Sequence, residues 1–157
     1  MEERHADVST AERLSRPAFS TEEYGRRLQA TWRRMDDQGI DCLLVHSFPN
    51  ICYLTGLETV APHKYFMLAV PLKGEPVLLS QDFETHNVML GACVSDVVAY
   101  GIESDHVAAT RDLLVGRGWS GQRLGLEFDS RGVSETVAVT ASGSEVLTGL
   151  PRALAVR

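Results

Sequence analysis

The sequence lacks the compact motifs that mark common catalytic and metal sites. Its 157 residues contain no H-E-x-x-H or C-x-x-C arrangement, and no G-x-S-x-G turn that would present a nucleophilic serine. Three glycines spaced as Gly116-x-Gly118-x-x-Gly121 follow a predicted helix instead of a strand, so they lack the context of a dinucleotide-binding turn. We therefore predict no catalytic residue and no metal ligand in this chain.

The sequence also has no excess of positive charge and no long apolar run. Fifteen lysines and arginines stand against 21 aspartates and glutamates, which gives a formal net charge of -6. This balance argues against nonspecific nucleic-acid binding, which needs basic patches that replace phosphate counterions. No run approaches 18 apolar residues, and the charged N-terminus has no apolar signal segment. We expect neither a nucleic-acid nor a membrane partner.

Cysteine is scarce, and the pattern of the three cysteines indicates a reducing compartment. Cys42, Cys52 and Cys93 are an odd number, and two of them lie in apolar runs where cysteine behaves as a small hydrophobe. We expect a cytoplasmic protein without disulfides. Cys52 could serve as an activated thiol, but its place between Ile51 and Tyr53 favours an inert, buried side chain.

The composition that is present suits one soluble globular domain, with 44% hydrophobic and 23% charged residues. Residues 1–18 mix charges and small residues, which predicts a flexible N-terminal tail. A helix is predicted to begin after Ser20, which forms a capping box with Glu23, and to end at Gly39. Its apolar stripe consists of Tyr24, Leu28, Trp32 and Met35.

The centre of the chain is the stretch from Cys42 to Leu57, CLLVHSFPNICYLTGL. Four consecutive apolar residues predict a strand that is covered on both faces. Pro49 interrupts this pattern, Asn50 is a favourable N-cap for a short helix, and Gly56 ends it. The residues predicted for the core are Leu43, Leu44, Val45, Tyr53 and Leu54.

Alternating strands and helices are predicted after this stretch. Residues 63–70 and 76–80 form a hairpin, and residues 95–100, 123–127 and the segment from Ser144 form further strands. Helices are predicted over residues 83–91 and 104–115, and from Val133 or Ser134 to about Gly143. Residues 19–157 should therefore form a single three-layer α/β domain, with a mixed sheet of five or six strands and helices on both faces.

The strand, the polar loop and the sequence NICYLTG together resemble the N-I-x-Y-L-T-G signature in the N-terminal domain of the creatinase/prolidase family. The resemblance extends from about Phe19 to Gly143. It implies a small α/β domain that precedes a larger "pita-bread" hydrolase domain, which is not in this chain. In that family the metal-binding aspartates, histidine and glutamates belong to the second domain. The resemblance thus implies no cofactor here, a divalent metal only in the C-terminal domain, and a homodimer.

The resemblance also implies where a substrate would be contacted. Creatinase-like relatives place an aromatic and a basic residue after this signature, and these residues reach a substrate pocket, often on the neighbouring subunit. His63 stands where creatinase has an arginine, and Ala61 falls where an aromatic residue is expected. The substrate-binding residues expected here are His63, Lys64 and Tyr65. We expect His63 to be at least partly exposed at the start of a strand.

Two functions are compatible with the sequence, and a third lacks the residues that it would need. The first is a noncatalytic N-terminal domain of a creatinase or Xaa-Pro peptidase-type hydrolase, which supplies dimer contacts and part of the substrate pocket. The alternative is a stand-alone binding or interaction module without enzyme activity. An autonomous hydrolase would need a nucleophile or a metal site, and the sequence presents neither.

Overall fold

The computed structural model describes residues 17–130, 133–140 and 143–146, and the side-chain surroundings of residues 17–127. The predicted tail therefore lies outside the described residues, apart from Pro17 and Ala18. The elements, in chain order, are α2 (Thr21–Gln38), β1 (Cys42–Val45), α3 (Phe48–Thr55), β2 (Met67–Pro71), β3 (Val77–Gln81), the 3-10 turn η1 (Asp82–Glu84), α4 (Thr85–Gly91), β4 (Asp96–Tyr100), α5 (His106–Gly116), β5 (Leu124–Ser130), β6 (Val133–Thr140) and β7 (Gly143–Val146).

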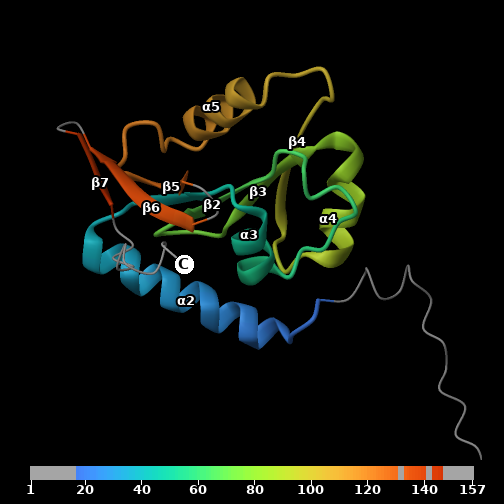
Figure 1. The fold of residues 1–157 in the computed structure, drawn as a ribbon, viewed down its shortest axis with the longest axis horizontal. Coiled ribbons are helices and arrows are strands. Elements are labelled where there is room, and N and C mark those ends of the chain that lie inside the picture. Colours follow the sequence, from blue (N-terminus) through green and yellow to red (C-terminus); the bar gives the residue numbers. More distant parts are fainter. Residues whose placement is uncertain (1–16, 131–132, 141–142, 147–157) are drawn as a thin grey trace, which may run out of the picture.

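Within the described residues, seven strands form one mixed sheet in the order β4-β3-β2-β1-β5-β6-β7 (Figure 1). β1 lies near the middle, antiparallel to β2 and parallel to β5. β2 and β3 form the predicted hairpin, and β3 pairs with β4 in parallel. The sheet has one strand more than the upper limit of the five or six predicted, because β6 takes the place of a predicted helix.

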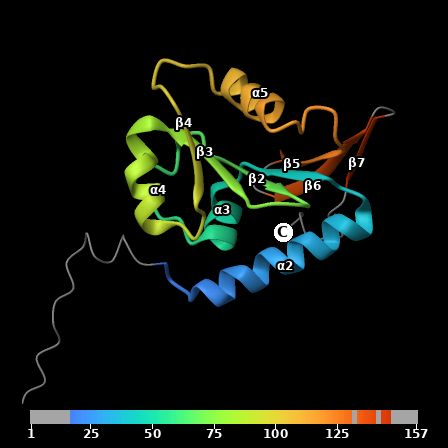
Figure 2. The ribbon, with the colours of Figure 1, turned by 180° about the vertical axis from the view of Figure 1, so that it is seen from behind.

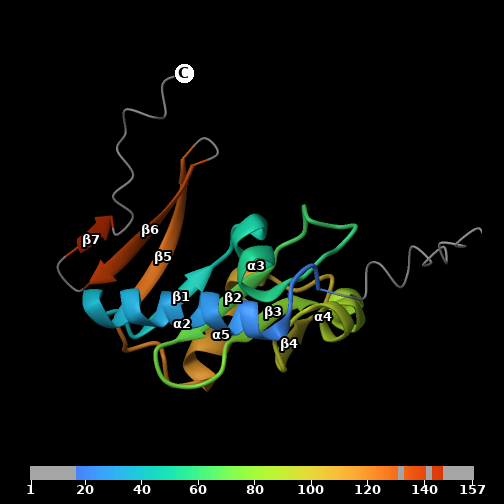
Figure 3. The ribbon, with the colours of Figure 1, turned by 90° about the horizontal axis from the view of Figure 1, so that it is seen from below.

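Helices cover both faces of the sheet, which confirms the predicted α/β fold class (Figures 1 and 2). On one face, α2, α3 and α4 pack against alternate strand residues such as Leu43, Leu68 and Leu78. On the other face, α5 packs through Leu113 against a second set that includes Leu44. Figure 3 shows α2 lying lengthwise along its face of the sheet. None of the helices in the described ranges combines the length and apolar character needed to cross a membrane.

The caps of α2 match those predicted from the sequence. The Ser20 hydroxyl accepts a hydrogen bond from the Glu23 backbone N–H at the start of the helix. Gly39 ends the helix with a positive φ of 65°, a backbone conformation that glycine adopts without strain. Local signals are therefore sufficient to set both ends of this helix.

Several predicted details are wrong, each for a physical reason. α3 begins at Phe48 with Ser47 as N-cap, and not at Asn50, because Pro49 fits the first turn of a helix. Tyr53 is 56% exposed instead of buried, because its ring packs at the surface against the Arg27 guanidinium, 4.4 Å from the ring centroid. β2 begins at Met67 instead of His63, because the preceding residues form a turn.

The largest error concerns the helix predicted over residues 133–143. This segment forms β6, which pairs antiparallel with β5, and β7 follows it. The β-branched residues that favour strands explain the difference, and they are Val133, Thr136, Val137, Val139 and Thr140. Residues 147–157 lie outside the described part of the chain.

Candidate functional site

The signature NICYLTG forms most of α3, and its last two residues fix the exit of the chain from this helix. The Thr55 hydroxyl donates to the Ile51 carbonyl over 2.7 Å and accepts from the Leu57 backbone N–H over 3.1 Å. Gly56 has a φ of 75°, and a Cβ atom there would lie 2.8 Å from the Tyr24 ring. Only glycine fits this position, because the backbone is left-handed and α2 approaches so closely.

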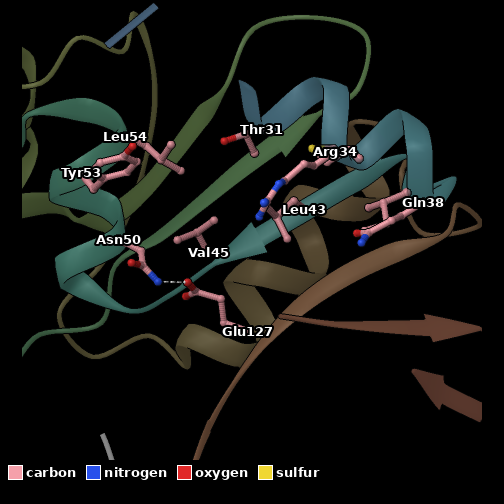
Figure 4. A pocket seen from close by; sticks show the side chains of 11 residues that line it. Thr31, Arg34, Gln38, Leu43, Val45, Asn50, Tyr53, Leu54 and Glu127 are labelled. Carbon is pink, nitrogen blue, oxygen red and sulfur yellow. Dashed lines mark hydrogen bonds between the residues drawn. The ribbon is translucent and has the colours of Figure 1, made fainter. Parts of the chain in front are cut away.

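The start of α3 is held by a carboxylate from β5. Glu127, whose side chain is 4% exposed, accepts hydrogen bonds from the backbone N–H groups of His46 and Ser47 over 2.8 and 2.7 Å. Its other oxygen accepts from the side-chain amide of Asn50 (Figure 4). The His46 imidazole Nδ1 lies 3.5 Å from the same carboxylate. This carboxylate therefore fixes the two residues that lead into α3, and it ties the start of the helix to the sheet.

A cavity of about 200 Å³ opens beside Glu127, between α2, β1 and α3. Its floor is apolar and includes Leu43, Val45 and Leu54 (Figure 4). Arg34 of α2 extends toward Leu43, and among the described residues it has no ion-pair partner. An apolar floor with a few polar groups at its margin is the usual character of a binding cavity.

Sequence reasoning did not identify Glu127 as a site residue. One signal was present: Glu127 ends the strand predicted over residues 123–127, and polar groups at the carboxyl ends of parallel strands often line sites in α/β sheets. The parallel pairing of β5 with β1 brings Glu127 to the start of α3. That pairing joins residues about 80 positions apart, so no local pattern could reveal it.

The segment after α3 presents His63 on a hydrogen-bonded turn. The Lys64 backbone N–H donates to the Ala61 carbonyl over 3.0 Å, so Pro62 and His63 occupy the two central positions. Pro62 has no N–H and a fixed φ, which suits the first of these positions. His63 is exposed, as predicted, although it lies in the turn and not at the start of a strand. Lys64 is half-buried beside it.

Tyr65 does not share its contacts with His63, because the Tyr65 side chain packs against α5. Its hydroxyl lies 3.0 Å from the Thr110 hydroxyl, and its ring centroid is 4.5 Å from that of His106. The Tyr100 hydroxyl donates to the Tyr65 carbonyl over 3.0 Å. These contacts anchor the end of the segment to the opposite face of the sheet. A role of Tyr65 in substrate binding stays a prediction, as it does for His63 and Lys64.

Two of the cysteines, the buried Cys42 and the half-buried Cys52, have thiols that are less acidic than usual. Burial raises the pKa of Cys52, and it raises the pKa of Cys42 to about 12. Neither thiol is therefore activated toward nucleophilic attack near neutral pH. Within the described ranges, no three histidine, cysteine, aspartate or glutamate side chains gather where they could hold a metal ion.

Solved structures share the fold of this chain. A dipeptidase from Mycobacterium ulcerans superposes with a TM-score of 0.57 at 19% identity, over 71% of this chain and 30% of that one. An Xaa-Pro aminopeptidase from Streptococcus pyogenes superposes with a TM-score of 0.55 at 21% identity, over 68% of this chain and 75% of that one. At these identities the likeness concerns the fold alone.

Sequence comparison identifies the family. Ectoine hydrolase from Halomonas elongata is 28% identical over 122 residues, and the match covers 71% of this chain and 30% of that enzyme. The chain thus spans less than a third of this relative. The family model described as the Creatinase/Prolidase N-terminal domain matches residues 27–148, which is most of the sequence. The chain belongs to the creatinase/prolidase N-terminal domain family.

Proposed function

We propose that this chain acts as the noncatalytic N-terminal domain of a C–N bond hydrolase, and that it supplies one wall of a substrate pocket completed by a second domain. The turn from Ala61 to Lys64 is the part of the wall that meets the substrate. The reaction itself, and any divalent metal that it requires, belong to the second domain. The protein works in the cytoplasm as a homodimer.

The extent of the family relationship supports this division of labour. The match to ectoine hydrolase covers 30% of that enzyme, which leaves room in such a protein for a larger domain. The residues described here offer no cluster of metal-binding side chains, and burial raises the pKa of Cys52. These features are more typical of a domain that binds and positions a substrate than of a domain that catalyses its hydrolysis.

The exposure of His63 on a fixed turn is the observation that carries the proposal. An exposed side chain is free to meet a substrate, while the hydrogen bond from Lys64 N–H to the Ala61 carbonyl fixes the backbone beneath it. Binding groups on loops held by a rigid scaffold are common in enzymes. An imidazole can hydrogen-bond a substrate carboxylate or carbonyl through either ring nitrogen.

A second candidate function is a binding module without enzyme activity. The cavity beside Glu127 favours it, because an apolar floor and the Arg34 guanidinium, which has no ion-pair partner among the described residues, could hold a small amphipathic molecule. Saturation-transfer NMR with a library of small amphipathic acids would detect such binding in the chain as it stands. This function requires no second domain.

Addition of a second domain tests the main proposal. The 157-residue chain should hydrolyse neither ectoine nor Xaa-Pro dipeptides, whereas a longer polypeptide with a hydrolase domain fused after residue 157 should hydrolyse one of them. Light scattering on both proteins measures the expected dimer. Hydrolysis by the 157-residue chain alone would overturn the assignment of the reaction to the second domain.

A further inference from the structure

Glu84 is a second buried glutamate, at the end of η1 just before α4. It is 2% exposed, which places it among the most buried large side chains of the described residues. The Thr59 hydroxyl donates to its carboxylate over 2.8 Å, and the Asn87 side-chain amide donates to the same oxygen over 3.2 Å. Both donors are uncharged. In the part of the chain with described side chains, no lysine, arginine or histidine forms an ion pair with Glu84.

This arrangement is unfavourable for stability alone. A buried carboxylate that only neutral groups bind recovers little of the hydration that it loses on folding. Two hydroxyl oxygens close to Glu84 in the sequence, those of Ser80 and Thr85, are also buried and have no hydrogen-bond partner among the described residues. Proteins retain such local costs where function requires them.

Thr59 connects Glu84 to the turn that carries His63. The same Thr59 hydroxyl that donates to Glu84 accepts a hydrogen bond from the Ala61 backbone N–H over 3.0 Å. Ala61 is the first residue of the turn, and its carbonyl accepts from the Lys64 N–H. A continuous series of hydrogen bonds therefore runs from the buried carboxylate to the backbone on both sides of His63.

We propose that Glu84, acting through Thr59, is a positioning residue that sets the place of His63 in the substrate pocket. This inference rests on the proposed function, because it assigns Glu84 a part in the same site. Glu84 does not touch the substrate. Its carboxylate orients the Thr59 hydroxyl, and this hydroxyl holds the first residue of the turn. Loss of the Thr59 hydroxyl should release the turn and leave the core in place.

Amide hydrogen exchange of the 157-residue chain, measured by NMR, tests the structural step. Thr59→Val keeps the shape of the side chain and removes the hydroxyl, whereas Thr59→Ser keeps the hydroxyl. We expect the amides of Ala61 and Lys64 to exchange at least tenfold faster in T59V and at the wild-type rate in T59S. The amides of Leu68 and Val70 in β2 should be unchanged in both. Unchanged exchange at Ala61 and Lys64 in T59V would overturn the proposal.

Glu84→Gln provides a second variant, in case T59V does not fold. Its amide oxygen can still accept from Thr59, so the turn should keep its protection. Glu84→Ala removes the acceptor, and exchange at Ala61 should become about as fast as in T59V. Protection at Ala61 that survives in Glu84→Ala would overturn the role of Glu84.

Kinetics of the two-domain protein test the functional step. T59V should lower kcat/KM about tenfold, T59S should restore it, and the double variant T59V with His63→Ala should be no slower than either single variant. Losses that multiply in the double variant, or an effect of His63→Ala without any effect of T59V, would overturn the proposal. If His63→Ala has no effect, the proposed function fails, while the exchange measurement still decides whether Glu84 and Thr59 hold the turn.

Discussion

Two buried glutamates bind the chain on either side of α3, and they differ in the groups that they bind. Glu127 binds the segment that leads into α3 through two backbone N–H groups and the Asn50 amide. Glu84 binds the segment that leads away from it through two side chains, Thr59 and Asn87. The His46 imidazole lies 3.5 Å from Glu127, whereas among the described residues Glu84 has no basic partner.

This difference suggests different roles, in which Glu127 stabilises the fold and Glu84 positions the turn that carries His63. The N-cap N–H of a helix, here that of Ser47, has no partner within the helix, and the helix dipole favours a negative charge there, so Glu127 stabilises the start of α3. Among the described residues the Glu84 carboxylate binds no backbone group directly, and the groups that it binds are side chains near the surface. We therefore expect changes at Glu127 to affect folding, and changes at Glu84 to affect mainly the turn that carries His63.

The largest effect is expected from Glu127→Leu. This change leaves two backbone N–H groups and the Asn50 amide without an acceptor, and each unpaired buried donor costs about 1–3 kcal/mol. We expect a loss of about 3 kcal/mol in the free energy of unfolding, because solvent recovers part of the cost. Urea denaturation measures the loss, with Glu58→Leu on the exposed loop as control. A loss no greater than that of the control would remove the stabilising role of Glu127.

A smaller effect on stability is expected from Gly56→Ala, at the C-cap of α3. An alanine there would have a left-handed backbone and a Cβ atom 2.8 Å from the Tyr24 ring. We expect a loss of about 2 kcal/mol in unfolding free energy, from conformational strain and crowding together. Gly25→Ala in α2 is the matched control, because no atom lies within 4 Å of its added Cβ. It should be neutral or stabilising, since alanine is the better helix former.

The smallest effect on stability is expected from Glu84→Gln. The amide oxygen can accept from both Thr59 and Asn87, so both hydrogen bonds can form again. The unfolding free energy should therefore change by less than about 1 kcal/mol. The unfolding temperatures of Glu84→Gln and Glu127→Gln should be compared. Both carboxylate oxygens of Glu127 accept hydrogen bonds, so Glu127→Gln loses an acceptor and should be the less stable variant. An equal or greater loss at Glu84 would contradict the separation of roles.

Local signals in the sequence were sufficient for much of the fold. Ser20 and Gly39 bound α2, the apolar run from Cys42 to Val45 forms β1, and the hairpin of β2 and β3 has its turn where predicted. These features depend on residues close together in the chain. The segment from Val133 was harder, because its β-branched residues favour a strand, and this strand needs β5 as its partner.

The site was predictable only in part. The exposure of His63 followed from Pro62, which indicates a turn, and from the apolar run that begins beyond it. The role of Asn50 was not predictable, because its amide binds Glu127, a residue 77 positions away. Tyr53 was expected in the core, but its ring lies outside, with the Arg27 guanidinium 4.4 Å from its centroid. Such partners depend on the packing of α2 and β5 around α3.

Substitution of His63 in the two-domain protein tests the central claim most directly. His63→Ala should lower kcat/KM about tenfold or more, which corresponds to about 1.4 kcal/mol of lost transition-state stabilisation, with the unfolding temperature nearly unchanged. His86→Ala, an exposed histidine on α4, should leave kcat/KM unaltered and serves as the matched control. Equal kcat/KM values for wild type, His63→Ala and His86→Ala on the hydrolysed substrate would contradict the claim that this turn forms part of the substrate pocket.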